Sequence, residues 1–114
     1  MIDWSQIQQL EEDIGAEDFG DVVVLFIEEV DEAVAQLQTI APTDLAQLAP
    51  ALHFLKGSAY NLGFKSFGDY CSNGEIQAMD GGGTDIDITK VAALYETSKA
   101  LFFKEASNHC SFKA

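Results

Sequence analysis

The chain has 114 residues, of which 47% are hydrophobic, and its formal net charge is −13. This length allows one hydrophobic core, so we expect a single folded domain over residues 1–114. All six positive charges are lysines, and so acidic a surface repels the phosphates of nucleic acids and anionic membranes. We therefore expect a protein partner, with neither nucleic acid nor membrane bound.

The amino terminus lacks the positive start and unbroken apolar run of a secretory signal. No stretch approaches 18 consecutive apolar residues, so we expect a cytoplasmic protein without a membrane span. Cys71 and Cys110 are too few for a disulfide framework, and we expect reduced thiols.

Two amphipathic helices are predicted in the first forty residues, because apolar side chains recur there at spacings of three and four. The first covers residues 3–14, with Asp3 or Ser5 as its cap. The second runs from Glu17 to about Ile40 and begins with acidic residues, which the helix dipole favours.

A third helix is predicted to begin after the turn at Pro42 and to end at Gly63, a natural C-terminal cap. Pro50 lies inside this stretch, where it either kinks the helix or marks a restart within its first turn. A fourth helix follows over residues 64–79, interrupted by Gly68 and Gly74.

Three consecutive glycines, residues 81–83, form a flexible connection to the last helix, for which Asp85 or Asp87 is the expected cap. The tail after about residue 107 is expected to fray. Five helices with short connections predict an all-α fold: an up-down four-helix bundle with the short N-terminal helix across one end.

The third predicted helix contains a face of chemical interest around His53. At about 100° per residue, Lys56 and Gly57 lie within about 60° of His53, beside the buried stripe, so His53 should be open to water. Imidazole is a good nitrogen nucleophile near neutral pH and a reasonable leaving group once phosphorylated. Lys56 can pair with phosphoryl oxygens, and Gly57 leaves room for a partner.

Each of these residues also has an ordinary interpretation. A lone surface histidine in a helix usually has no function, and a lysine three residues later is commonly a solvated side chain. A helix glycine often serves only tight packing. Spacing alone is therefore weak evidence.

The eleven residues from His53 to Gly63 closely resemble the signature of the histidine-containing phosphotransfer (HPt) domain family, His-x-Leu-Lys-Gly-Ser followed by Leu-Gly. The resemblance implies that His53 accepts a phosphoryl group from the aspartate of one receiver domain and donates it to another. It implies that Lys56 supports the phosphoryl group and that Gly57 gives access. The implied partners are receiver domains of hybrid histidine kinases and response regulators.

The family also places a Gln or Glu on the next helix to hold the imidazole, and Cys71 and Glu75 fall at the matching positions. Gly74 departs from the family, where an apolar residue is usual. If Glu75 accepts a hydrogen bond from Nδ1 of His53, Nε2 becomes the nucleophile. Considered without the family, Glu75 is simply a solvated acid.

Other functions fit the sequence less well. Without a glycine-rich nucleotide loop, the chain is expected to be a phosphoryl carrier and not an enzyme. A hydrolytic pair of His53 and Glu75 would lack a nucleophile and an oxyanion site. The main alternative is a helical interaction module without phosphotransfer. His109 and Cys110 alone are too few for a metal site, so we expect neither metal nor cofactor.

The surface around His53 supplies the expected docking contacts. Phe54, Tyr60 and Phe64 are candidates for apolar contact with a receiver domain, while Lys56 and Lys65 are expected to form a small positive patch. Such a contact should be small and transient, and the protein is expected to be a monomer.

Overall fold

The computed structural model describes residues 2–41, 43–81, 86–110 and 112, and within these ranges every regular element is helical. The prediction of an all-α fold is therefore confirmed. In chain order the elements are α1 (Trp4–Ile14), α2 (Ala16–Leu37), α3 (Leu45–Asn61), α4 (Lys65–Met79), α5 (Ile88–Glu105) and the short 3-10 helix η2 (Ala106–Asn108).

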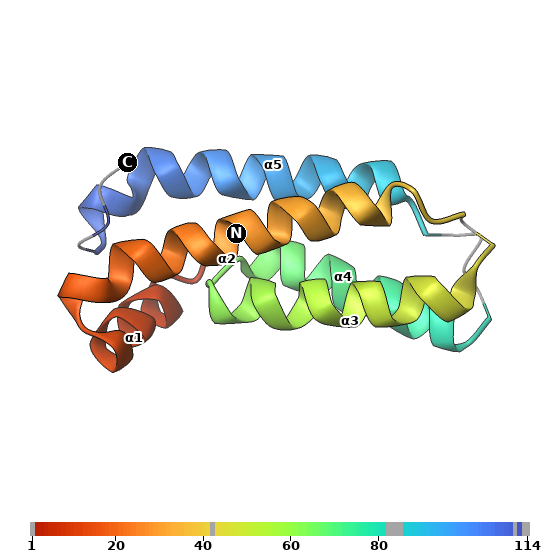
Figure 1. The fold of residues 1–114 in the computed structure, drawn as a ribbon, viewed down its shortest axis with the longest axis horizontal. Helices are drawn as coiled ribbons and strands as arrows, with labels where there is room; N and C mark the ends of the chain where they lie inside the picture. Colours follow the sequence, from red (N-terminus) through yellow and green to blue (C-terminus); the bar gives the residue numbers. More distant parts are fainter. Residues whose placement is uncertain (1, 42, 82–85, 111, 113–114) are drawn as a thin grey trace.

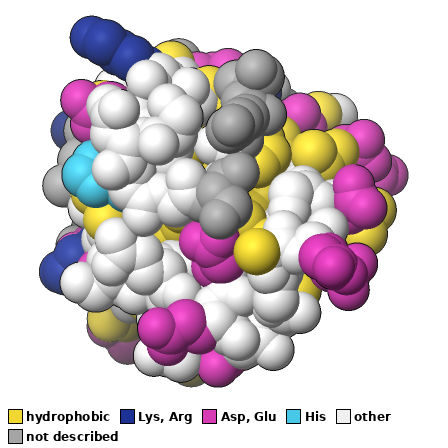
Figure 2. Space-filling model, turned by 90° about the vertical axis from the view of Figure 1, so that its left-hand side faces the viewer, with side chains coloured by type: hydrophobic (Ala, Val, Ile, Leu, Met, Phe, Trp, Pro, Cys, Tyr) yellow, Lys and Arg dark blue, Asp and Glu magenta, His cyan; other side chains and the backbone are white. Residues whose placement is uncertain are grey.

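Four long helices lie side by side along the longest axis of the molecule, and α1 sits at one end of them (Figure 1). Residues 42 and 82–85 lie outside the described residues, and with them the predicted turn at Pro42 and most of the glycine connection. Figure 2 shows the end that carries α1, where Asp and Glu side chains are spread over the surface.

Aspartates begin three of the helices. The Asp3 and Asp44 side chains each accept a hydrogen bond of 3.3 Å from the backbone N–H three residues later, and the Asp87 side chain accepts one of 3.0 Å. These bonds satisfy N–H groups that have no partner inside the first turn. Of the two candidates for the first cap, Asp3 is therefore the one used.

α3 continues through Pro50 without interruption. Pro50 is preceded by a full turn of helix that begins at Leu45, so a restart with Pro50 in the first turn is wrong. The ring removes the N–H that would bond to the Ala46 carbonyl, and this single loss is offset by burial of the flanking residues Leu48 and Leu52.

The apolar faces of all five helices meet in one core. Its largest fully buried side chains are aromatic: Tyr95, Phe19, Phe64, Phe67 and Phe102. Phe64 and Phe67 each pack against Tyr95, with ring centroids 6.3 and 5.3 Å apart. Aromatic packing of this kind ties the start of α4 to α5.

The described part of the C-terminal tail packs on the helices, unlike the frayed tail expected after about residue 107. The Trp4 ring stacks against His109, with centroids 4.2 Å apart, and against Phe102, with centroids 5.9 Å apart. Phe112 is buried against Phe102. Aromatic burial holds this segment, because each large ring removes much apolar surface from water.

A three-residue connection at positions 62–64 joins α3 to α4 and depends on Gly63. This residue has a φ of 78°, a left-handed conformation that glycine adopts without strain. A Cβ there would also lie 2.7 Å from the Asp3 carbonyl oxygen. The Asp3 N–H donates a 2.7 Å hydrogen bond to the Gly63 carbonyl, so α1 is fixed to this corner.

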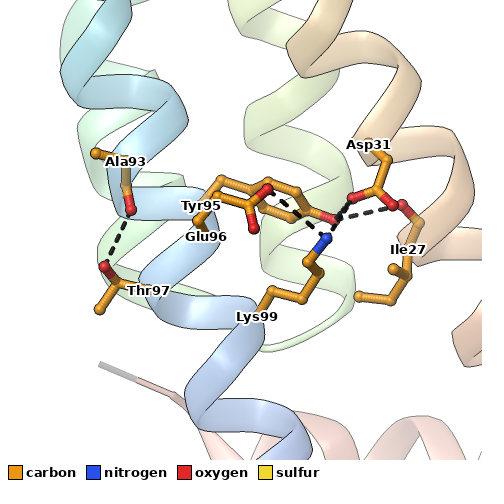
Figure 3. A network of polar contacts seen from close by, with 7 residues as sticks. All are labelled: Ile27, Asp31, Ala93, Tyr95, Glu96, Thr97 and Lys99. Carbon is orange, nitrogen blue, oxygen red and sulfur yellow. Dashed lines mark hydrogen bonds and ion pairs between the residues drawn. The ribbon is translucent and has the colours of Figure 1, made fainter.

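α2 and α5 are joined by a polar network centred on Asp31 (Figure 3). The buried Tyr95 hydroxyl donates to Asp31 Oδ1 at 2.7 Å, and the Lys99 ammonium approaches the same oxygen at 3.0 Å. Burial, and then the hydrogen bond to Asp31, raise the pKa of Tyr95. The hydroxyl therefore stays protonated and remains a donor.

Candidate functional site

His53 lies in the middle of α3 on its exposed side. Leu52, Leu55 and Ala59 form the buried stripe of this helix, so their helical spacing turns the imidazole outward. The His53 side chain is 68% exposed. A ring so accessible can be reached directly by a group on another protein.

Glu75 on α4 joins His53 to Lys56. Its Oε2 lies 2.8 Å from Nδ1 of His53, and its Oε1 lies 2.7 Å from the Lys56 ammonium. The two contacts use both oxygens of one carboxylate, and the Glu75 side chain is largely covered. The three residues thus form a single hydrogen-bonded cluster across the α3–α4 interface.

The negative charge of Glu75 determines which nitrogen of the His53 ring carries the hydrogen. The hydrogen bond from Lys56, followed by the contacts with His53, holds the pKa of the Glu75 carboxyl below its ordinary value. An ionised carboxylate can only accept hydrogen bonds, so Nδ1 of a neutral His53 carries the hydrogen. Nε2 then holds the free lone pair and is the nucleophilic atom.

Two glycines shape the surroundings of the cluster in different ways. A Cβ at Gly57 would meet nothing within 4 Å, so the surface beside His53 is open there. A Cβ at Gly74 would lie 3.2 Å from Leu52 Cδ1, because α3 and α4 pack closely at this level. The missing side chain at Gly74, a departure noted in the sequence, lets the two helices approach where Glu75 meets His53.

The residues proposed for docking are divided by the structure. Phe54 and Tyr60 are partly exposed, but Phe64 is only 1% exposed and packs in the core. Phe64 was therefore wrongly predicted as a docking residue. The chain turns inward after Gly63, and the Phe64 ring lies between Tyr95 and Phe102.

The expected positive patch of Lys56 and Lys65 is not formed. Lys56 pairs with Glu75, while Lys65 pairs with Asp69 at 3.4 Å. Lys65 precedes Glu75 by ten residues of α4, which corresponds to about 15 Å along the helix axis. The two ammonium groups are therefore separate, and each is neutralised by a carboxylate.

A second polar contact was not anticipated from the sequence. The Tyr60 hydroxyl donates to Asp69 Oδ1 at 2.6 Å, and this bond is the main cause that raises the pKa of Tyr60 to about 12. A Cβ at Gly68 would lie 2.6 Å from the Tyr60 ring, so glycine is needed beneath it. The sequence signal that could have indicated this contact is Gly68, which follows Tyr60 by eight residues across the short connection between α3 and α4.

In this cluster Nε2 of His53 can act as a nucleophile, while Glu75 holds the ring through Nδ1. Within the part of the chain that the structure covers, no three His, Cys, Asp or Glu residues are grouped so that they could bind a metal ion. Among the same residues, no helix is long and apolar enough to cross a membrane.

Comparison with known families gives one match. The model of a family described as the Hpt domain matches residues 21–101, a segment that contains all of α3 and α4, with His53, Lys56, Gly57 and Glu75. The match covers well over half of the chain. No curated protein and no solved structure matches.

Proposed function

The chain belongs to the Hpt domain family, and from that membership we propose that it carries a phosphoryl group on Nε2 of His53 between receiver domains. Domains of this family are phosphocarrier modules and not kinases. The observation that carries the proposal is the contact of Glu75 with Nδ1, because it keeps the hydrogen on Nδ1 and leaves Nε2 of the exposed ring unprotonated as the nucleophile.

In the proposed transfer, the lone pair of Nε2 attacks the phosphorus of an aspartyl phosphate on the donor receiver. A nitrogen–phosphorus bond forms, and the phosphorus–oxygen bond breaks with its electron pair leaving on the aspartate carboxylate. The ring then carries a positive charge, which the Glu75 carboxylate stabilises through Nδ1–H. In the second transfer, a carboxylate oxygen of the acceptor attacks phosphorus, and the electron pair returns to Nε2.

Lys56 and Gly57 serve this transfer in different ways. The Lys56 ammonium has three donors, so it can hold Glu75 and still donate to a phosphoryl oxygen. Gly57 presents bare helix beside the imidazole, where the acceptor's active site must approach closely. These assignments account for the histidine, lysine and glycine of the helix α3 motif.

The scaffold belongs to the same proposal. We propose that residues 1–114 act as one monomeric, cytoplasmic domain in which α2 to α5 form an up-down bundle. The course of the colours along the helices in Figure 1 supports this arrangement. One shared core supports a single domain.

Label transfer tests the proposal. The purified chain is incubated with radiolabelled, phosphorylated receiver domains from its own genome, and label is followed onto the chain and onward to unlabelled receivers. The label on the chain should be acid-labile and base-stable, because it is held by a nitrogen–phosphorus bond, and His53→Gln should carry none.

Two results would contradict this function. Label retained by His53→Gln would place the phosphoryl group elsewhere. Receiver binding without any label transfer would favour the alternative, a helical module that binds receivers but has no phosphotransfer chemistry.

A further inference from the structure

A groove of about 360 Å³ lies between α2 and α3, directly beside the candidate site. Its lining includes Phe54, the residue that follows His53, whose side chain is 45% exposed. Ala33, Ile40 and Ala51 extend the apolar part of the lining. The groove can therefore accept an apolar side chain from another protein.

The α2 side of the groove is acidic. Glu29 and Glu32 line it, one helical turn apart, and both are exposed. Glu32 accepts a 3.4 Å hydrogen bond from Gln36, and no ion pair is recorded for either glutamate within the described ranges. These carboxylates are available to a positive charge on a partner.

The lysines around His53 differ from these glutamates, because each is already paired. Lys56 and Lys65 are held by Glu75 and Asp69 at 2.7 and 3.4 Å. Close pairs of opposite charge largely cancel at a distance, so the field beside His53 is set by the unpaired carboxylates of α2. A partner that approaches this face is attracted by its own positive charge.

We infer that the receiver domain that docks on His53 inserts an apolar side chain into this groove and pairs a neighbouring lysine or arginine with Glu29 and Glu32. The inference rests on the proposed phosphotransfer function and names the contact that selects the receiver. A transient protein interface covers up to about 600 Å² on each partner, a disc of about 14 Å radius. Phe54 is adjacent to His53, so the groove lies inside such a footprint.

Charge reversal tests the acidic side of the groove. The groove variant, Glu29→Lys with Glu32→Lys, is compared with a control variant, Glu12→Lys with Glu17→Lys. The control makes an equal change in charge on two exposed residues, one near the end of α1 and the other in the first turn of α2. The probe is a purified receiver domain that exchanges label with the parent chain. At low salt, the groove variant should exchange label about tenfold more slowly or worse, whereas the control should stay within about twofold of the parent.

Salt and the apolar contact provide two further measurements. The deficit of the groove variant should shrink as salt rises, because screening removes the repulsion between charges. Phe54→Ala removes apolar lining without changing charge, so its deficit should be similar at low and high salt. A groove variant that exchanges label as fast as the parent at low salt would overturn the inference and leave the proposed function intact.

Chemical labelling separates docking from the reactivity of His53. Phosphoramidate, a small phosphoryl donor, should label the groove variant and the parent at the same rate, since no protein docks in that reaction. A slower rate for the groove variant would mean that the substitutions disturb the site itself, which would also overturn the inference. If the parent exchanges label with no receiver at all, the proposed function fails and this inference fails with it.

A charge swap identifies the residue on the partner. Each exposed lysine or arginine of the receiver is substituted in turn by glutamate. Substitution of the residue that pairs with Glu29 and Glu32 should slow transfer with the parent chain and restore transfer with the groove variant. Absence of such a restoring position on a receiver that transfers label would rule out the proposed pairing.

Discussion

Asp31 and Glu75 each bridge a ring to a lysine, with opposite results. Asp31 accepts from the Tyr95 hydroxyl and from Lys99, while Glu75 contacts Nδ1 of His53 and Lys56. Tyr95 is fully buried, and its one polar group is used by the contact. His53 is exposed and has a second nitrogen, so the same kind of bridge leaves a reactive atom free.

The comparison shows that the carboxylate bridge does not by itself determine what a residue does. The number of polar atoms on the ring and its access to water decide between a structural contact and a chemical one. Substitutions in the two regions should therefore have opposite signatures. We expect a loss of stability from changes in the α2–α5 network (Figure 3) and a loss of transfer rate from changes in the α3–α4 cluster.

The largest change in stability is expected from Tyr95→Phe. Loss of a hydrogen bond to a charged acceptor should lower the free energy of unfolding by about 2 kcal/mol, measured by urea denaturation followed by circular dichroism. Chemical labelling of His53 should be unaffected in the native protein. Slower labelling of His53 in a folded Tyr95→Phe variant would contradict this expectation, because it would show that the α2–α5 network affects the reactivity of the α3–α4 cluster.

Glu75→Gln should give the opposite signature. A hydrogen bond to a charged group is about twice as strong as a neutral one, so the transfer rate should fall about tenfold with little change in stability. Rates of label transfer in rapid-quench experiments and unfolding curves of the same preparation measure both quantities. An unchanged rate would show that Glu75 does not act on the ring.

Lys56→Ala and Lys65→Ala are a matched pair of controls for this result. Both lysines pair with a carboxylate on α4, but only the partner of Lys56 also holds His53. Lys56→Ala should fold normally and slow transfer, whereas Lys65→Ala should leave the chemical step unchanged.

The smallest change in stability is expected from Gly57→Leu. Leucine has a higher helix propensity than glycine and meets open space here, so stability should rise by a little under about 1 kcal/mol. Receiver docking should nevertheless be blocked, because the side chain covers the approach to His53. Gly68→Ala is the contrasting variant, since its Cβ would lie 2.6 Å from the Tyr60 ring and should destabilise the fold.

The helices and the motif could be predicted because their signals are local. Apolar spacing located all five helices, and the residues from His53 to Gly63 located the nucleophile within one helix. The network of Asp31, Tyr95 and Lys99 could not be found in this way, because its partners are separated by 64 and 68 residues. No local pattern distinguishes such partners from other polar residues on a helix surface.

The errors also have a physical origin. Phe64 was expected to be a docking residue, but the left-handed Gly63 directs the chain back into the core. Lys56 and Lys65 were counted as free charges because a sequence shows charges without their partners. Glu75, which neutralises Lys56, lies on the next helix, and Asp69, which pairs with Lys65, lies four residues later on the same helix.

The three-residue connection between α3 and α4 bears on the order in which the protein folds. Closing so short a loop costs little chain entropy, and contacts between its two helices are local in sequence. The hairpin should therefore be formed in the folding transition state, with His53 and Glu75 already opposite one another, before α5 docks. Leu52→Ala should then slow folding, whereas Val91→Ala on α5 should mainly speed unfolding; stopped-flow kinetics in urea showing the reverse would place the nucleus elsewhere.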